Sequence, residues 1–198
     1  MIRSILIVIF FIPLFCMAGH RDSTASKNFL SLHVDYPVPL SGVTFQRVYV
    51  GAFTIDAGFE RLFYRKFSVG VFMDYSVFQI NTKVLAVKTT MNIASPSLNI
   101  GYQALLFKKI FIHPSIHGGY AFISFNGKDA NGNPKPKFRE QGVFVQPSLL
   151  ISYMLNNKLS IGVNAYYKVI FQHFGNNSAF EENTTRMTGF GVGVTYKL

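Results

Sequence analysis

The residues best suited to chemistry in this chain are His113, Ser115 and His117, which alternate along one short stretch. A histidine beside a serine hydroxyl can take its proton and activate the oxygen as a nucleophile. On a β-strand, side chains two residues apart point to the same side, so all three would share one face. Such a site also needs an acid that orients the histidine, and the sequence does not identify one. The triplet is therefore either a nucleophilic site or polar filling of an interior, and we favour the second interpretation.

Further ionisable residues fall on what we expect to be the same face of several strands. Buried charges persist in proteins when they are paired and hydrogen-bonded. We therefore predict a plug of paired charges, with a narrow ion path as the alternative. The histidines lack the ligand spacing of known metal sites, and we expect no metal and no cofactor. The predicted cluster contains His33, Asp35, Asp56, Glu60, Asp74, His113, His117, Asn164 and Lys168.

The elements that must position these residues show an alternation of apolar and polar side chains. In 158–171, one parity is apolar (Leu159, Ile161, Val163), and the other is mostly polar or glycine. A period of two is typical of β-strands whose two faces are solvated differently. The pattern recurs in eight segments, namely 28–37, 46–63, 67–79, 96–106, 110–122, 142–155, 158–171 and 186–198.

Short and long connections alternate between these segments. Tight turns are expected at 64–66, 108–109 and 156–157, and longer polar links at 38–45, 80–90, 126–141 and 173–185. This alternation predicts an all-β, up-and-down antiparallel meander. An even number of strands lets the first pair with the last and leaves no open edge. The predicted fold is an eight-stranded antiparallel up-and-down β-barrel.

The bore of such a barrel decides which face points inward. Eight strands enclose just enough space for side chains. The parity rich in Phe, Tyr, Ile, Leu and Val is too bulky for that space, whereas Ser, Gly, Asn, Gln and Thr fit. The apolar face should therefore point outward, into a bilayer, where a closed barrel satisfies every backbone group. The alternative, a soluble lipocalin-like barrel with an apolar interior, would need charged residues where Ser and Gly dominate.

Three prolines, Pro96, Pro114 and Pro147, fall inside predicted strands. Proline has no N–H to donate to a neighbouring strand, and a closed barrel has no free edge for it. We therefore expect a local bulge at each of these positions.

Composition and the N-terminus agree with an exported membrane protein. The chain has 198 residues and only 14% of them are charged, against about 25% in ordinary soluble domains. Residues 1–18 combine a basic start, an apolar run and small residues before Ala18, which is the pattern of a signal peptide. A periplasmic linker (19–27) and the barrel (28–198) would follow. The one cysteine, Cys16, lies in the signal peptide, so we expect no disulfide in the barrel.

Aromatic residues gather near the short-turn ends of the strands, where an interfacial girdle would lie. Together with segments of about ten alternating residues, short turns and long loops, this pattern resembles the small bacterial outer-membrane barrels of the OmpA/OmpX type. The resemblance covers 28–198, although Leu198 stands where that family more often has an aromatic residue. It implies a Gram-negative outer membrane and contact with membrane lipid. The girdle residues are Tyr64, Phe67, Phe107, Tyr153 and Tyr196.

The net charge of +10 is concentrated in turns and loops. Loop 126–141 contains four bases, Lys128, Lys135, Lys137 and Arg139. They would either bind lipopolysaccharide phosphates by charge-assisted hydrogen bonds or form a solvated surface. Bases scattered around a membrane band disfavour nucleic-acid binding. We expect a structural or surface-interaction protein rather than an enzyme, with lipopolysaccharide and a surface or envelope protein as candidate partners. The alternatives are a narrow channel and an enzyme that modifies lipid A, since lipid A deacylases also use a His-x-Ser pair.

Overall fold

The computed structural model describes residues 28–40, 43–64, 66–80, 89–127, 138–172 and 184–198. The predicted signal peptide and linker, 1–27, lie outside this part of the chain. The strands are β1 (Asn28–Pro39), β2 (Tyr49–Tyr64), β3 (Phe67–Ile80), β4 (Thr89–Tyr102), β5 (Ala104–Phe107), β6 (Ile110–Gly127), β7 (Phe138–Met154), β8 (Leu159–Gln172) and β9 (Thr184–Lys197), with a short helix, α2 (Val43–Val48).

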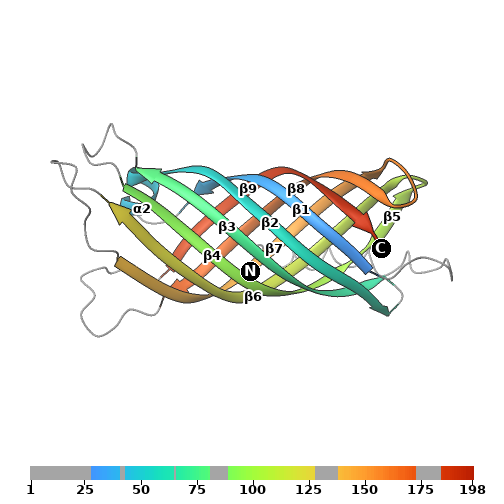
Figure 1. Ribbon diagram of the computed structural model, residues 1–198, viewed down its shortest axis with the longest axis horizontal. Helices are drawn as coiled ribbons and strands as arrows, with labels where there is room; N and C mark the ends of the chain where they lie inside the picture. The colour runs from blue at the N-terminus through green and yellow to red at the C-terminus, as the bar shows by residue number, and fades with distance from the viewer. Residues whose placement is uncertain (1–27, 41–42, 65, 81–88, 128–137, 173–183) are drawn as a thin grey trace, which may run out of the picture.

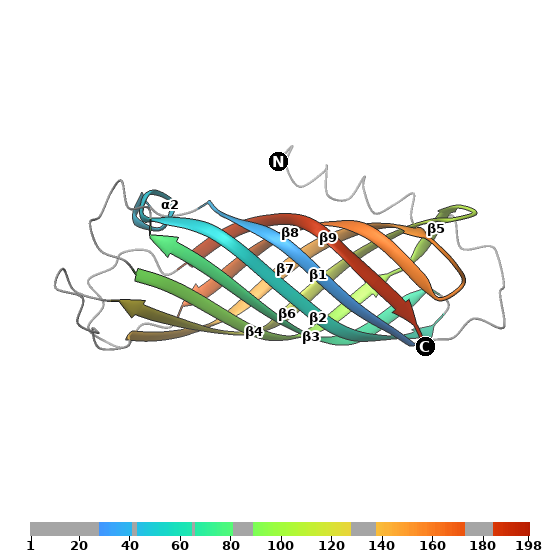
Figure 2. The same ribbon diagram turned by 45° about the horizontal axis from the view of Figure 1, so that its top comes forward.

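The strands form one closed antiparallel wall. β1 pairs with β9 from Phe29 opposite Lys197 to Pro39 opposite Met187, and β4 pairs with β6, so the sheet has no open edge. β4 and β5 are two parts of one wall segment, since both pair with β6 and only Gln103 separates them. Nine strands therefore make eight wall segments, and the predicted fold is confirmed. Figures 1 and 2 show the strands wound obliquely around a long cylinder.

The two ends of the cylinder differ. The turns at Lys66, at 108–109 and at 155–158 lie at one end, together with the C-terminus, and we call it the turn end (Figure 1). Helix α2 lies at the opposite end, which we call the loop end. The predicted strand 46–63 was wrong at its start, because residues 46–48 belong to α2. The reason is tertiary: Phe45 of this helix packs on Phe78 inside the rim, with ring centroids 5.5 Å apart.

The prolines do not produce bulges, so that prediction was wrong. The register between β4 and β6 is the same before and after Pro96, and that between β7 and β8 is the same across Pro147. Each proline pairs normally on its other side, with Met73 or Ile116. The register irregularities lie instead between Gly51 and Phe53, between Leu62 and Tyr64, and between Leu105 and Phe107.

Pro114 accounts for the break that separates β4 from β5. The β4 ladder stops at Gly101 opposite Ser115, and the β5 ladder resumes at Ala104 opposite Ile112. The gap therefore faces Pro114, which has no N–H to donate. Gln103 donates its own backbone N–H to Lys66 O at 2.8 Å, a bond to the neighbouring turn. A missing donor thus breaks one ladder locally and leaves the register intact.

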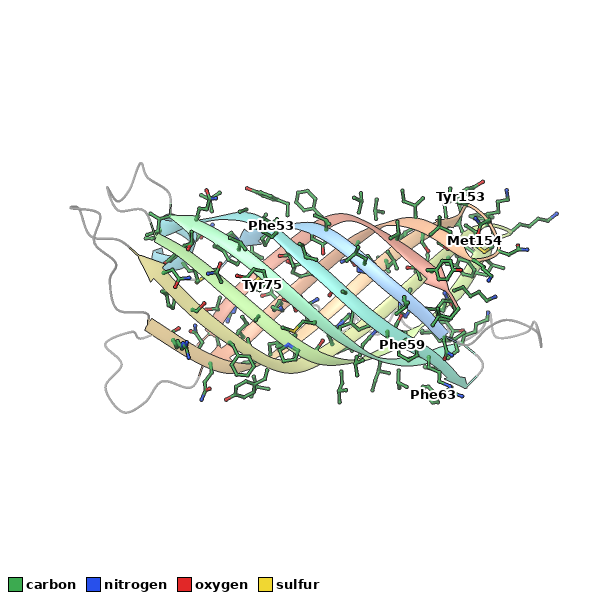
Figure 3. All side chains as sticks on the ribbon, viewed as in Figure 1. Phe53, Phe59, Phe63, Tyr75, Tyr153 and Met154 are labelled. Carbon is green, nitrogen blue, oxygen red and sulfur yellow. The ribbon has the colours of Figure 1, made fainter. Side chains whose placement is uncertain are left out.

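The apolar parity points outward, as predicted. Ile100, Val163 and Val194 are 62%, 56% and 41% exposed on the outside of the wall. Figure 3 shows the same direction for the labelled aromatic side chains Phe53, Phe59, Phe63, Tyr75 and Tyr153. A closed barrel with an apolar outer surface has the architecture of a transmembrane barrel. Among the described residues, no helix is long and apolar enough to cross a bilayer.

The interior divides into two halves. In the half nearer the loop end, the side chains form an apolar cluster, which we call the apolar plug, and α2 covers it through Phe45. The alternation predicts polar filling throughout, and that prediction is wrong for this half. Single apolar residues near strand ends do not stand out in the alternation. In the half nearer the turn end, the interior is polar. The plug contains Phe78, Met91, Ile93, Ala121, Ile123, Phe144, Tyr166, Ile170 and Met187.

We predict that Val163→Arg lowers the unfolding free energy in lipid vesicles by about 2–4 kcal/mol, because Val163 lies on the outer face in the middle part of the wall. The matched control is Leu155→Arg in the turn after β7, where a charge reaches the interface and should cost about 0–1 kcal/mol. Urea titration followed by gel migration measures both. Equal costs would contradict the membrane-embedded outer face.

Candidate functional site

The polar half of the interior is the candidate functional site, and it contains the nine residues singled out from the sequence. They come from five strands, β1, β2, β3, β6 and β8, and all are between 1% and 8% exposed. We call this set the polar lumen cluster. The members are His33 and Asp35, Asp56 and Glu60, Asp74, His113 and His117, and Asn164 and Lys168.

A buried ion pair marks the boundary between the two halves. Lys168 Nζ donates to both carboxylate oxygens of Asp74, each at 2.7 Å, and to Ser95 Oγ at 3.1 Å. The same ammonium lies 4.4 Å from the centroid of the Phe144 ring, which belongs to the apolar plug. The Lys168 side chain thus has all three donors occupied and a cation–π contact besides. Removal of one partner of such a pair leaves an uncompensated charge.

Two histidine–carboxylate pairs lie nearer the turn end. His33 Nδ1 is 3.4 Å from Asp56 Oδ1, between residues directly opposite each other on β1 and β2. His113 Nε2 is 3.5 Å from Glu60 Oε1 and 3.2 Å from Ser68 Oγ. These four side chains and Ser68 therefore form two adjoining polar groups across the lumen.

Glycines let polar side chains reach across a whole strand. Glu60 and Asn99 both lie opposite Gly70, on its two sides, and Asn99 Nδ2 donates to Glu60 Oε1 across it. A Cβ at Gly70 would come within 2.6 Å of Glu60 Cγ. Such a contact is shorter than real Cβ atoms tolerate, so the bond needs a glycine beneath it.

The same arrangement recurs on the other side of the barrel. Asp35 and Asn164 both lie opposite Gly191, and Asn164 Nδ2 donates to the two Asp35 carboxylate oxygens at 3.4 and 3.3 Å. A Cβ at Gly191 would lie 2.5 Å from Asp35 Oδ1. Inward-facing glycines therefore make room for hydrogen bonds between strands that are not neighbours.

The His113–Ser115–His117 triplet has a geometry that favours filling over catalysis. Ser115 Oγ lies 3.3 Å from His117 Nε2 and 2.6 Å from Ser148 Oγ. His117 Nε2 is also 3.2 Å from Ser148 Oγ, and its ring packs edge-on against Phe72 with centroids 4.9 Å apart. The ring nitrogen is thus shared by two hydroxyls. Ser115 is buried, so a substrate would have to enter the lumen to meet it.

A small cavity lies inside the polar lumen cluster. It has about 20 Å³ of room for solvent, enough for a single water molecule. Three buried polar atoms without a protein partner belong to residues that line it: His33 Nε2, Asn99 Oδ1 and Gln146 Oε1. Two acceptors and one ring nitrogen match the donors and acceptors of one bridging water. Within the described residues, no group of His, Cys, Asp or Glu is arranged to hold a metal ion.

Several residues of this site were not singled out from the sequence. Asn99, Gln146 and Ser148 line the cavity, Ser68 bonds Glu60, and Ser95 bonds Lys168. All of them lie on the inward parity of their strands, so the alternation itself was the signal. The sequence analysis singled out mainly ionisable side chains, and an amide or hydroxyl on the inward parity carries no charge that would mark it as part of a site.

The predicted basic loop is described only in part. Lys128, Lys135 and Lys137 lie outside the described residues. Arg139 was wrongly placed in the loop, because β7 begins at Phe138 and Arg139 is paired with Ser124 of β6. β6 and β7 are 18 and 17 residues long, whereas about 9–11 residues suffice to cross a bilayer. The wall therefore extends beyond the hydrocarbon layer at the loop end, where Arg139 is exposed.

Solved structures of bacterial outer-membrane barrels match this fold. Neisserial surface protein A is 10% identical with a TM-score of 0.57, over 89% of this chain and 100% of that one. A major outer membrane protein from Thermus thermophilus is 13% identical with a TM-score of 0.55, over 86% and 99%. Ail of Yersinia pestis, in complex with the heparin analogue sucrose octasulfate, is 8% identical with a TM-score of 0.52, over 88% and 100%.

These matches establish the fold as that of outer-membrane barrels, and the outer membrane is the location that fold and outward face together indicate. No protein-family model matches the chain, and no curated protein matches its sequence.

We predict that Gly70→Ala lowers the unfolding free energy by about 1–3 kcal/mol, because the methyl group displaces Glu60 and leaves buried polar atoms without partners. Gly118→Ala is the control: a Cβ there meets nothing closer than Phe144 O at 4.0 Å, so stability should change by less than about 1 kcal/mol. Denaturant titration of both variants in the same vesicles measures the difference. A similar small change in both would show that the strand-crossing bond contributes little.

Proposed function

We propose that this protein is a non-enzymatic outer-membrane barrel whose filled lumen makes it a rigid anchor for long outer loops. The loops would contact lipopolysaccharide and, through it or beside it, a surface or envelope protein. The observation that carries the proposal is the filled bore: an apolar plug in one half and hydrogen-bonded charges in the other. A barrel with a filled lumen can bind partners only through its outer surface and its two ends.

The plug favours an anchor over a channel. Phe78, Ile93 and Phe144 are fully buried within the loop-end half of the lumen. An ion would have to displace these side chains and break the Lys168–Asp74 pair beside them. Desolvation of an ion against apolar side chains is costly, which supports a closed state as the resting structure.

The position of Ser115 favours an anchor over a lipid-modifying enzyme. A lipid A acyl chain lies outside the wall, whereas Ser115 is buried inside it and bonded to Ser148. A general base must lie within reach of a substrate-bound nucleophile. The wall between lipid and Ser115 supports the filling role.

Charge at the loop end supports the choice of lipopolysaccharide. Arg139 is exposed on the part of β7 that extends past the hydrocarbon layer, and the sequence of the adjoining loop holds three lysines, Lys128, Lys135 and Lys137. Phosphates on a membrane surface are good partners for such bases. The complex of Ail with sucrose octasulfate concerns a protein of the same fold bound to a heparin analogue, and it motivates the proposal that this chain binds an anionic glycolipid.

The proposed topology predicts which end can be labelled from outside the cell. Because Cys16 is the one natural cysteine, Asn131→Cys and Asn157→Cys each place a unique thiol in the predicted mature chain. A membrane-impermeant maleimide on intact cells should label Asn131→Cys, and should label Asn157→Cys only after the outer membrane is permeabilised. The reverse pattern, or protection of both thiols, would contradict the proposed orientation.

The lipopolysaccharide contact predicts a charge-dependent affinity. Substitution of Lys128, Lys135, Lys137 and Arg139 together by glutamine should weaken binding of purified lipopolysaccharide to the detergent-solubilised protein by at least about tenfold, since charged hydrogen bonds are lost. The control changes Lys128, Lys135 and Lys137 to arginine, which keeps the positive charge and should leave this affinity unchanged. An unchanged affinity in the loop variant would contradict this contact and show that the loop bases form a solvated surface.

A further inference from the structure

A ring of basic side chains surrounds the turn end, and the proposed contact with lipopolysaccharide does not use it. The three short turns each carry at least one lysine, and β2 and β9 each add one base close to the same rim. The bases are distributed over β2, the β2–β3, β5–β6 and β7–β8 turns, and β9, so they encircle the barrel. We call the following set the basic collar: Arg61, Lys66, Lys108, Lys109, Lys158 and Lys197.

The acidic side chains of the described residues lie away from this collar. Of the five Asp and Glu side chains in the described residues, four face the lumen: Asp35, Asp56, Glu60 and Asp74. Glu140 lies near the start of β7, at the loop end. The outer surface of the described turn end therefore carries an excess of positive charge. An anionic partner is the ligand such a surface fits.

Two members of the collar are held next to each other by the backbone. Lys197 N donates to Lys158 O at 2.7 Å, which places the two residues side by side on β9 and the β7–β8 turn. Asn156 Oδ1 accepts from the N–H groups of Lys158 and Leu159, each at 2.8 Å, and this fixes the turn. The backbones of these two lysines therefore occupy one fixed part of the rim.

Aromatic side chains show the depth at which the collar lies. Phe107 and Tyr196 directly precede Lys108 and Lys197, and both rings are exposed on the outer face. Lys109 Nζ lies 5.7 Å from the ring centroid of Tyr153, which Figure 3 shows at the turn end and outside the wall. Aromatic belts mark the membrane–water interface. The Lys109 ammonium group next to this belt therefore lies at the level of lipid headgroups, and Lys108 lies in the same turn.

We propose that the basic collar binds the phosphate groups of anionic phospholipids in the leaflet around the turn end. In the orientation of the proposed function, this is the periplasmic, phospholipid leaflet, and the inference rests on that orientation for its biological meaning. Surface lysines and arginines attract anionic lipid by electrostatics that fall off within a Debye length. Bases around the whole circumference would gather a shell of anionic lipid and fix the vertical position of the barrel.

The test compares lipid preference in a variant that lacks four collar charges. The full chain is refolded in vesicles of phosphatidylcholine with phosphatidylglycerol, and spin-labelled lipids report the association of each lipid with the protein. Next to each base that reaches the headgroups, the wild-type chain should bind phosphatidylglycerol roughly fivefold more strongly than phosphatidylcholine. This preference should weaken as salt is added. Substitution of Lys108, Lys109, Lys158 and Lys197 by glutamine should lower this preference and leave only the part contributed by Arg61 and Lys66.

Matched variants separate charge from folding. The same four positions changed to arginine should keep the preference, and all variants should show the heat-dependent gel migration of a folded barrel. An equal preference in wild-type and glutamine variant would overturn the proposal. So would a glutamine variant that keeps its lipid preference but loses binding to purified peptidoglycan, which would assign the collar to that polymer instead. Failure of the thiol-labelling pattern would refute the orientation alone, because the vesicle measurement does not depend on it.

Discussion

The narrow bore of an eight-segment wall is the constraint on which the rest of this structure depends. Eight strands close around a space that side chains can fill completely, so every inward position must hold a small residue, a well-packed apolar one or a polar one with a partner. Bulky side chains without such a place point outward, where Ile100, Val163 and Val194 form part of an apolar surface. The direction of the apolar face, and with it the membrane as solvent, follows from the size of the interior.

Within that bore, glycine acts as a spacer between polar partners. Gly70 and Gly191 lie beneath the bonds from Asn99 to Glu60 and from Asn164 to Asp35. Each bond joins strands separated by a third, and it ties the wall together across the lumen. An unpaired carboxylate in a low-dielectric interior is costly. A different strand register would leave Glu60 and Asp35 without these partners, so the two bonds favour the observed register. The apolar plug then removes water from the other half, and Lys168 joins the two environments.

Most acidic and most basic side chains occupy different parts of the described structure. Four of the described carboxylates are inside, where they accept hydrogen bonds, while the basic collar encircles the turn end and Arg139 is exposed near the loop end. A protein that anchors in a membrane and meets anionic groups at its surface is consistent with this distribution. The cavity in the polar lumen cluster has room for about one water molecule, and the proposed function accordingly uses the outer surfaces.

By itself, the sequence determined the strands, the even number of wall segments, the pairing of the first with the last, and the inward direction of residues such as Asp74 and Lys168. These properties depend on a period of two, which each strand carries in its own residues. Tertiary structure alone decided that Lys168 meets Asp74, that Asn99 reaches Glu60 over Gly70, that Phe45 covers the plug from a helix, and that Pro96 and Pro147 leave the register intact. The physical reason is that alternation gives the side on which a residue lies, whereas its partner depends on the register and tilt of strands distant in the chain, which no single segment encodes.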